Sequence, residues 1–326
     1  YEMTSSLVGS EMCIRDRMGS TIHNWDMLER GYTMHHAISQ DKQGNILATV
    51  SKTSAKIANG KDVRINDFII MMDPEKGEIL QEWDLVHMLD SARYGMTDYD
   101  LTSDPFAQSA SNWAHNNGIV EWGDDYLATA RYQGIFKFNK AGGIEWIISP
   151  HGYWRDKYLK LLLNPLHADG TPITDPEVIA GTKNCDDFEW PWGCHTAVPL
   201  PNGHILYFNN GYGRNFKLDF TDRKNIYTCG IEYEVDEVNR TVRQVWQYGK
   251  ERGAAYFTPA RSGVQYLEQT GNRLICPGMS NVLSNGNRGA RVTEVDPETQ
   301  DVVFELELED AIYQRVYRMS LYPENQ

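Results

Sequence analysis

The chain has little basic charge and no long apolar run. None of its apolar stretches approaches the roughly 18 residues that cross a bilayer, so we expect no membrane span. Lys and Arg number 31 against 45 Asp and Glu, which gives a net charge of −14. Nucleic-acid-binding proteins carry a basic surface, so this composition argues against a nucleic-acid partner. An anionic substrate would need cations placed locally within an otherwise acidic protein.

Nucleotide-binding motifs and cysteines are also scarce. The sequence has neither a Walker loop nor a Gly-rich phosphate cradle. One of its five cysteines, Cys13, lies in residues 6–17, which look like translated sequencing-adapter read-through of the kind found in assembled metagenomes. We therefore divide the chain into a non-native segment, residues 1–17, and one domain, residues 18–326, whose native N-terminal part we expect to be missing.

The sequence does contain a repeat. Aromatic residues make up 11% of the chain and glycines number 27, which is typical of all-β proteins with many short strands. Four units recur, at residues 35–83, 113–146, 195–246 and 263–306. Each reads as four short strands separated by turns of Gly, Asn, Asp and Pro. Such units predict the blades of a β-propeller, with a β-sandwich or a two-domain fold as the alternative.

Segments outside the four units also fit a propeller. Residues 20–25 resemble the outer strand of an earlier blade, and residues 314–321 resemble an inner strand that would close the ring. Two long insertions between blades, residues 84–112 and 149–193, are expected to wall a pocket on one face. The second insertion contains a helix-like stretch at residues 154–163.

Histidines open three of the four units. His35 and His36 begin the first unit, His115 lies at the start of the second and His195 begins the third. Because the inner strands of a propeller surround its axis, we expect these imidazoles to converge on one site. Any one of them alone could be structural. Three histidines could also hold zinc or iron, although no local His-x-His or His-x₃-His pairing supports that alternative.

At these positions the sequence resembles the bacterial PAPS-independent arylsulfate sulfotransferases. Four elements are similar to that family's motifs, in the same order: NWAHNN at 112–117 (D-W-x-H-x-N), ARYQ at 130–133 (S-R-x-Q), CHTA at 194–197 with NNG at 209–211 (H-T-A … D-N-G), and VWQYGKERG at 245–253 (V-W-x-Y-G-K-E-R-G). The resemblance extends from about Trp25 to Tyr322. The order and spacing of the elements make it specific.

The resemblance implies a six-bladed propeller and a ping-pong transfer that uses no cofactor and no metal. A histidine takes SO₃ from a phenolic sulfate donor and passes it to an acceptor phenol, and by motif that histidine is His195. His115 and Arg131 would flank the sulfuryl group, and His36, which we favour over His35, would be a further active-site histidine. Neutral imidazole is a good nucleophile near pH 7. A guanidinium suits the charge that spreads over the transferred group.

Four further residues are assigned to substrate binding by motif or position: Asn117, Thr196, Arg214 and His151. An ion pair is the alternative for Arg214, and a structural role is the alternative for His151. Three residues depart from the family pattern: Asn112, Tyr132 and Asn209. None removes a catalytic group, but they leave the orientation of His115 less certain.

The resemblance also concerns Cys185 and Cys194. Periplasmic members of the family can carry a disulfide shortly before the catalytic histidine, so we expect a bridge between these two, with reduced thiols as the alternative. A bridge would favour a periplasmic or secreted location, and the cytoplasm stays an alternative. The expected partners are the small-molecule donor and acceptor, and a homodimer is compatible with them. A non-catalytic ligand-binding propeller and a propeller enzyme with a histidine-bound metal are the competing functions.

Overall fold

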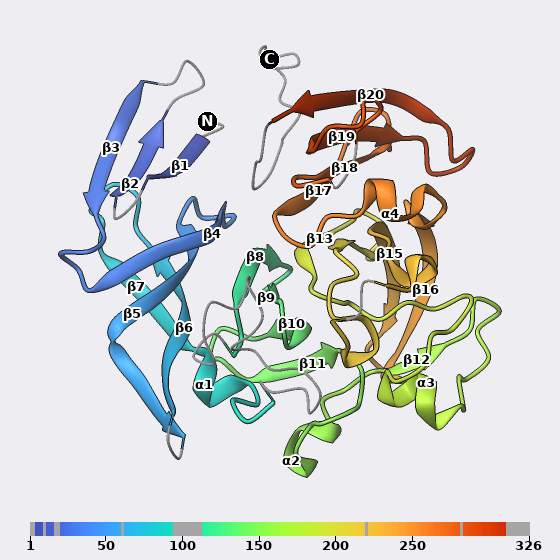
Figure 1. The fold of residues 1–326 in the computed structure, drawn as a ribbon. Coiled ribbons are helices and arrows are strands. Elements are labelled where there is room, and N and C mark those ends of the chain that lie inside the picture. The colour runs from blue at the N-terminus through green and yellow to red at the C-terminus, as the bar shows by residue number, and fades with distance from the viewer. Residues whose placement is uncertain are drawn as a thin grey trace.

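The chain folds into small, mainly antiparallel sheets arranged around a common centre (Figure 1). The computed structural model describes residues 20–52, 67–93, 113–218, 221–280 and 283–310 in full, and the backbone alone of residues 4–8, 11–15, 53–59 and 62–66. Within these ranges lie three four-stranded sheets, one five-stranded sheet and one three-stranded sheet. The predicted β-propeller is therefore confirmed.

Each predicted unit coincides with one blade. Blade 1 comprises β4 (Tyr32–Gln40), β5 (Ile46–Asn59), β6 (Asp62–Met72) and β7 (Ile79–Asp84). Blade 2 comprises β8 (Asn116–Trp122), β9 (Asp125–Ala130), β10 (Gly134–Phe138) and β11 (Ile144–Ile148). Blade 3 comprises β13 (His195–Pro199), β14 (Ile205–Asn209), β15 (Cys229–Asp236) and β16 (Thr241–Tyr248). Blade 4 comprises β17 (Ser262–Tyr266), β18 (Arg273–Pro277), β19 (Gly289–Val295) and β20 (Val302–Glu309).

The first strand of each blade is the innermost. β4 contacts β8, β8 contacts β13, and β13 contacts β17, so these four strands from distant parts of the sequence face one another near the centre (Figure 1). Gly118 lets blades 2 and 3 approach closely, because a Cβ there would lie 3.5 Å from the Cα of Thr196 and only 2.3 Å from Oγ1 of Thr129.

The hydrophobic core lies between neighbouring blades. Three clusters of buried side chains join blades 1 and 2 (Leu47, Trp83, Phe136 and Phe138 among them), blades 2 and 3 (Ile135, Trp146, Tyr207 and Tyr233) and blades 3 and 4 (Leu206, Phe208, Val264 and Ile275). Burial of each large apolar side chain stabilises the fold by about 1.5–3 kcal/mol. The blades therefore hold one another in place, and with them the loops at the centre.

A three-stranded sheet precedes blade 1. It has the order β1 (Thr4–Val8), β2 (Glu11–Arg15), β3 (Thr21–Asp26), so β3 is an edge strand, as the predicted outer strand of an earlier blade would be. Two of its strands fall within residues 1–17, whose assignment as non-native stays a prediction. The closing strand predicted at residues 314–321 lies outside the described residues.

The second insertion is less helical than its sequence pattern predicts. Of residues 154–163, only α2 (Asp156–Leu159) is helical. The helix ends because Leu161 and Leu163 bond the backbone of Ile147, the penultimate residue of β11. The chain then forms β12 (Asn164–Leu166), which pairs in parallel with β16, followed by α3 (Pro176–Ala180). Hydrogen bonds to the outer strand β11 therefore outweigh the local preference of this segment for a helix.

The remaining helices are single turns. They are α1 (Leu85–Met88), α4 (Gly253–Tyr256) and the 3₁₀ turns η1 (Arg214–Phe216), η2 (Arg223–Asn225) and η3 (Lys250–Arg252). No helix within the described ranges is long and apolar enough to cross a bilayer.

Candidate active site

The inner strands share an unusual backbone conformation. A non-glycine residue with positive φ lies in the middle of β4, at His36 (54°), and at or just before the start of the other three, at His115 (53°), Thr196 (44°) and Arg261 (59°). Such a conformation is uncommon and unfavourable for residues with a Cβ. A β-bulge accompanies it in blades 1, 2 and 3. Because bulges and strained residues re-aim side chains, this recurrence marks the centre of the propeller as the candidate site.

Three histidines form a connected row there. Nδ1 of His36 lies 3.1 Å from Nδ1 of His35, and Nε2 of His36 lies 3.0 Å from Nε2 of His115. The ring centroid of His195 is 6.3 Å from that of His36. The predicted convergence of the four imidazoles is therefore confirmed. His36 is the member of the doublet that faces His115 and His195.

The far end of this row meets a carboxylate. Nε2 of His35 lies 3.6 Å from Oδ1 of Asp67, and Oδ2 of Asp67 accepts a hydrogen bond of 2.9 Å from the backbone N–H of Asn116. His36 uses its two ring nitrogens on opposite sides. The rings therefore form a hydrogen-bonded row, and this geometry does not favour a histidine-bound metal at the centre.

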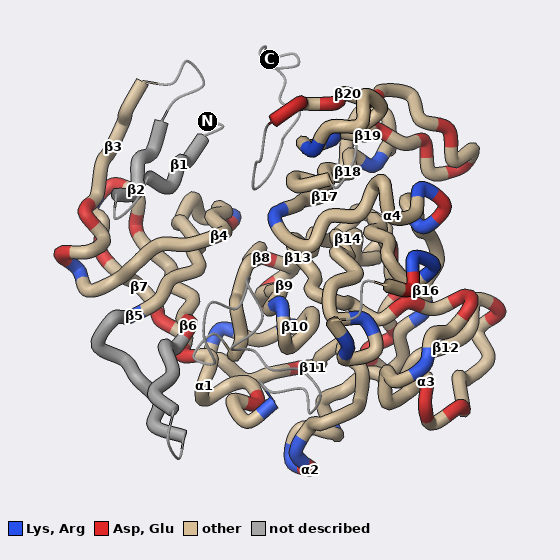
Figure 2. The backbone as a smooth tube through the Cα atoms, in the orientation of Figure 1, with Lys and Arg blue, Asp and Glu red and all other residues tan. Residues whose placement is uncertain are grey.

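Burial and nearby cations keep the middle of the row neutral. Burial lowers the pKa of both His36 and His115 well below 6.5, and the positive field of Arg131 and of the neighbouring imidazoles lowers each pKa further. Arg261 acts on His36 in the same direction. Figure 2 marks basic residues beside β9 and at the start of β17, where these two arginines lie. They are the local cations that an anionic substrate needs in this acidic chain.

The lowered pKa values predict how stability depends on pH. In the unfolded chain both imidazoles titrate near 6.5, whereas the folded protein protonates them only at lower pH. The unfolded state therefore binds more protons below pH 6.5, and stability should fall there by up to about 1.4 kcal/mol per pH unit for each histidine. Urea unfolding at pH 7 and pH 5 measures this loss. It should be smaller in His36→Gln and unchanged in His87→Gln, whose side chain is 83% exposed; equal losses in all three proteins would contradict the assignment.

The ring of His195 is held in one tautomer. Its Nδ1 lies 2.6 Å from Oδ1 of Asn210 and 3.2 Å from the carbonyl oxygen of Gly193. The Asn210 amide is oriented by its Nδ2, which donates to the carbonyl of Thr258 at 2.9 Å. Both partners of Nδ1 are therefore acceptors, so Nδ1 carries the proton and Nε2 carries the lone pair of the neutral ring.

Neighbouring residues fix the chain that presents His195. Asn117 donates to the carbonyl of Cys194 at 2.8 Å and accepts from Oγ1 of Thr129 at 2.7 Å, so both ends of its amide are engaged by protein. Asn209, one of the departures from the family pattern, accepts from the backbone N–H of Trp192 at 2.9 Å. It also donates to the carbonyl of Trp190, so it fastens the segment just before His195.

The tautomer assignment makes Asn210 a positioning residue for His195. In Asn210→Ala the Nδ1 proton loses its closer acceptor and keeps only the carbonyl of Gly193 at 3.2 Å, and we expect the turnover number of a reaction that uses His195 to fall by roughly 10² or more, with little change in KM. Asn202→Ala is the matched control, because Asn202 bonds the imidazole of His204 away from the centre. Equal turnover by both variants would show that Asn210 does not orient the reacting ring.

Arg131 lies against aromatic rings at the edge of this site. The side chain is only 2% exposed, and its Nη2 donates to the carbonyl of Pro259 at 2.8 Å. Its guanidinium carbon lies 4.6 Å from the ring centroid of Tyr212 and 5.7 Å from that of Tyr132. Tyr132, another departure from the family pattern, also meets His115 edge to face at 5.9 Å.

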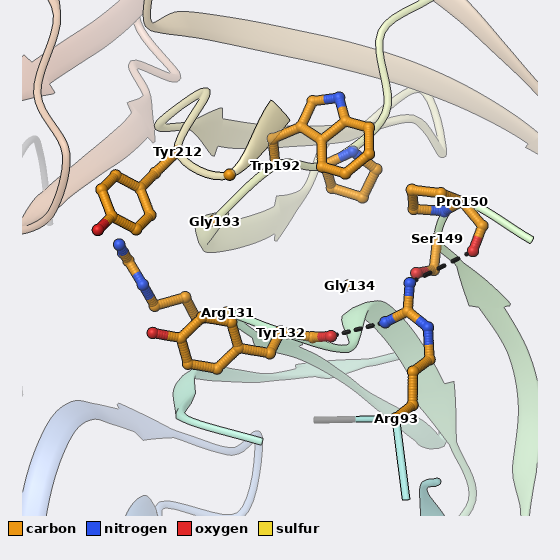
Figure 3. A pocket seen from close by; sticks show the side chains of 11 residues that line it. Arg93, Arg131, Tyr132, Gly134, Ser149, Pro150, Trp192, Gly193 and Tyr212 are labelled. Atoms are coloured by element: carbon orange, nitrogen blue, oxygen red, sulfur yellow. Dashed lines mark hydrogen bonds between the residues drawn. The ribbon is translucent and has the colours of Figure 1, made fainter. Parts of the chain in front are cut away.

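A small pocket of about 20 Å³ lies beside Arg131 (Figure 3). Three aromatic side chains (Tyr132, Trp192 and Tyr212) and two arginines (Arg93 and Arg131) are among its lining residues. Carbonyls hold Arg93, including that of Tyr132 at 2.6 Å. Gly193, whose carbonyl meets His195, also lines the pocket. The pocket and the histidine row therefore share a wall, and arginine and aromatic side chains line it.

The other predicted substrate-binding residues lie in different surroundings. Thr196 is buried directly after His195 and has the positive φ described above. Arg214 forms a buried ion pair with Glu189 and stacks on Tyr227 at 3.9 Å, which matches the ion-pair alternative. The Nε2 of His151 bonds the carbonyl of Leu163 at 3.0 Å, and this residue does not line the pocket. Asn112 lies outside the described residues.

The disulfide predicted between Cys185 and Cys194 is not formed. Both cysteines are free thiols in this structure. The sulfur of Cys194 is buried toward the carbonyl of Ala130, whereas that of Cys185 bonds Oδ1 of Asp187 at 3.1 Å. The two side chains are held by different partners, which the spacing of nine residues in the sequence did not reveal.

Two functional candidates were not identified from the sequence. Asn210 was part of the NNG element but had no role assigned, because its partner lies on a neighbouring strand. Arg261 occupies in blade 4 the place that His36 and His115 occupy in blades 1 and 2. Its position in the repeat was a signal that could have revealed it.

Comparison with known proteins agrees with this site. The arylsulfotransferase (ASST) family model matches residues 2–318. The chain is 28% identical to the arylsulfate sulfotransferase AssT of Escherichia coli O6:H1 (strain CFT073) and 29% identical to that of Lelliottia amnigena. Each match covers 94% of this chain and 56% of the relative, so the chain spans about half the length of these curated proteins.

Solved structures are more distant. A europium-containing methanol dehydrogenase has 11% identity and a TM-score of 0.40, with 96% of this chain and 68% of that one covered. The family model, in contrast, spans nearly the whole chain. The chain therefore belongs to the arylsulfotransferase family.

Proposed function

We propose that this protein transfers a sulfuryl group from a phenolic sulfate ester to an acceptor phenol through a sulfohistidine at His195. The observation that carries the proposal is the single tautomer of His195, which presents the Nε2 lone pair at a site lined by arginine and imidazole. A propeller that only bound its ligand would not need a ring nitrogen whose lone pair is kept unprotonated by a fixed tautomer.

The first half-reaction forms the covalent intermediate. The Nε2 lone pair attacks the sulfur of the donor, an S–N bond forms, and the S–O bond to the aryl group breaks. The departing oxygen becomes a phenolate and then takes a proton. The guanidinium of Arg131 stabilises the charge on the sulfuryl oxygens, and Asn210 holds the Nδ1 proton of His195 throughout.

The imidazole row handles the proton. His115 and His36 are neutral in the free protein, and the negative charge of a bound sulfate ester raises their pKa values. One of these rings can then carry a proton, release it to the departing phenolate and take it back from the acceptor phenol. In the second half-reaction the acceptor oxygen attacks sulfur, the S–N bond breaks and His195 is restored.

The aromatic lining beside Arg131 suits the chemistry of an aryl group, and the pocket of about 20 Å³ must widen to admit one. Tyr132, Trp192 and Tyr212 supply aromatic rings for a flat apolar substituent, and Arg131, whose guanidinium lies against Tyr212, lines the same pocket. Donor phenol and acceptor phenol are alike in shape and would use the same wall in turn, as a ping-pong order requires. Neither half-reaction needs a nucleotide.

The direct test is phenol release from an aryl sulfate, measured with and without a second phenol. We expect rapid release only when the acceptor is present, together with formation of the acceptor's sulfate ester. Binding of the aryl sulfate without turnover under both conditions would overturn the proposal and favour a ligand-binding propeller.

A further inference from the structure

A second cluster of reactive side chains lies outside the catalytic centre. His167, Cys185 and Asp187 come from the second insertion, and one ligand atom from each lies within 4.8 Å of the others. Nδ1 of His167 is 2.9 Å from Oδ1 of Asp187, and Sγ of Cys185 is 3.1 Å from the same oxygen. All three side chains are half-buried, so solvent can reach them.

The carboxylate is held by the main chain. The backbone N–H of Ala168 donates to Oδ2 of Asp187 at 2.9 Å, which leaves Oδ1 directed at the imidazole and the thiol. His167 itself lies at one end of a tight turn, where its N–H bonds the carbonyl of Thr171 at 2.8 Å. Asp169, in that turn, is a second carboxylate near His167 and Asp187. The cluster is therefore positioned by backbone contacts.

The ligand chemistry selects a particular class of cation. Thiolate, imidazole and carboxylate together are a zinc-type set, and sites with three protein ligands keep a water at the fourth position. Zinc–ligand bonds of 2.0–2.3 Å require ligand atoms about 3.3–3.8 Å apart. The two separations from Oδ1 of Asp187, 2.9 and 3.1 Å, would lengthen by a few tenths of an ångström on binding.

We propose that His167, Cys185 and Asp187 bind one zinc-class divalent cation, with water as the fourth ligand. Binding releases the thiol proton of Cys185 to solvent, and the proton on the imidazole moves to Nε2 so that Nδ1 can ligate. The ion joins the turn after β12 to the segment that runs from Cys185 into Trp190, Trp192 and His195. It therefore clamps the insertion that presents His195 and takes no part in the transfer itself.

Cobalt provides a spectroscopic test that does not depend on the proposed function. Untagged, chelator-treated protein is titrated with Co²⁺, and we expect one ion per chain with a thiolate-to-cobalt charge-transfer band in the near ultraviolet. Zn²⁺ should displace the cobalt and raise the Tm. Absence of the charge-transfer band in the wild-type protein would overturn the proposal.

Variants identify the ligands. Cys185→Ser should lose the band, and Asp187→Asn should weaken cobalt binding by more than the roughly 10- to 100-fold that loss of an outer-shell partner costs. His204→Gln is the matched control. It removes an imidazole that lies 2.6 Å from the carboxylate of Glu232, but that pair contains no cysteine, so cobalt binding should be unchanged. Near-ultraviolet circular dichroism confirms that each variant is folded. Retention of the band in folded Cys185→Ser, or of full affinity in folded Asp187→Asn, would contradict the assignment.

Discussion

His195→Asn is expected to lower the turnover of an aryl sulfate by at least about 10⁴-fold, because it removes the atom that takes the sulfuryl group. Asparagine fills part of the space of the ring, so the propeller should stay folded, with a near-ultraviolet circular dichroism spectrum like that of the wild-type protein. The measurement is the rate of phenol release at saturating donor and acceptor.

The matched control for this variant is His204→Asn. His204 is also an imidazole of blade 3, but its partner is Glu232 and not the central row. We expect it to keep nearly full turnover. If folded His195→Asn kept turnover within tenfold of the wild type, His195 would not be the nucleophile. His115 and His36 would then be the next candidates for that role.

Arg131→Ala should lower kcat/KM for the donor by roughly 10²–10³, since a preorganised cation that meets developing charge contributes that much in comparable sites. Arg131→Lys should recover part of the loss, because lysine keeps the charge without the planar fork that lies between Tyr132 and Tyr212. Initial rates over a range of donor concentrations separate the effect on kcat from that on KM.

Arg252→Ala is the control for a lost guanidinium. Arg252 pairs with Glu305 at the outer edge of blade 4 and lies far along the blade from the inner strands. We expect its kinetics to match those of the wild type. Wild-type kcat/KM in Arg131→Ala would mean that the guanidinium does not meet the sulfuryl group.

The repeat explains why the fold and the central histidines could be predicted from the sequence. Turn residues and outer-strand tryptophans such as Trp83 and Trp146 recur at the same place in successive units, and they reveal the blades without any knowledge of contacts. Once blades are assigned, position within a blade places His36, His115 and His195 near one axis. The structure shows the three rings together: Nε2 of His36 lies 3.0 Å from Nε2 of His115, and the ring centroid of His195 lies 6.3 Å from that of His36.

Features that depend on contacts between blades could not be predicted in the same way. The role of Asn210 follows from its hydrogen bonds to His195 and Thr258, which lie 15 and 48 residues away. The helix expected in the second insertion was overridden by the free edge of β11. The pairing of Cys185 with Asp187 and not with Cys194 was likewise set by the folded loop.

The sulfohistidine itself can be observed directly. The protein is incubated with aryl sulfate and no acceptor, quenched at alkaline pH, digested and examined by peptide mass spectrometry. We expect an acid-labile SO₃ increment on the peptide that contains His195, which disappears when acceptor phenol is added before the quench and is absent in His195→Asn. Steady turnover with no such increment, or an increment on a peptide without His195, would contradict covalent transfer through His195.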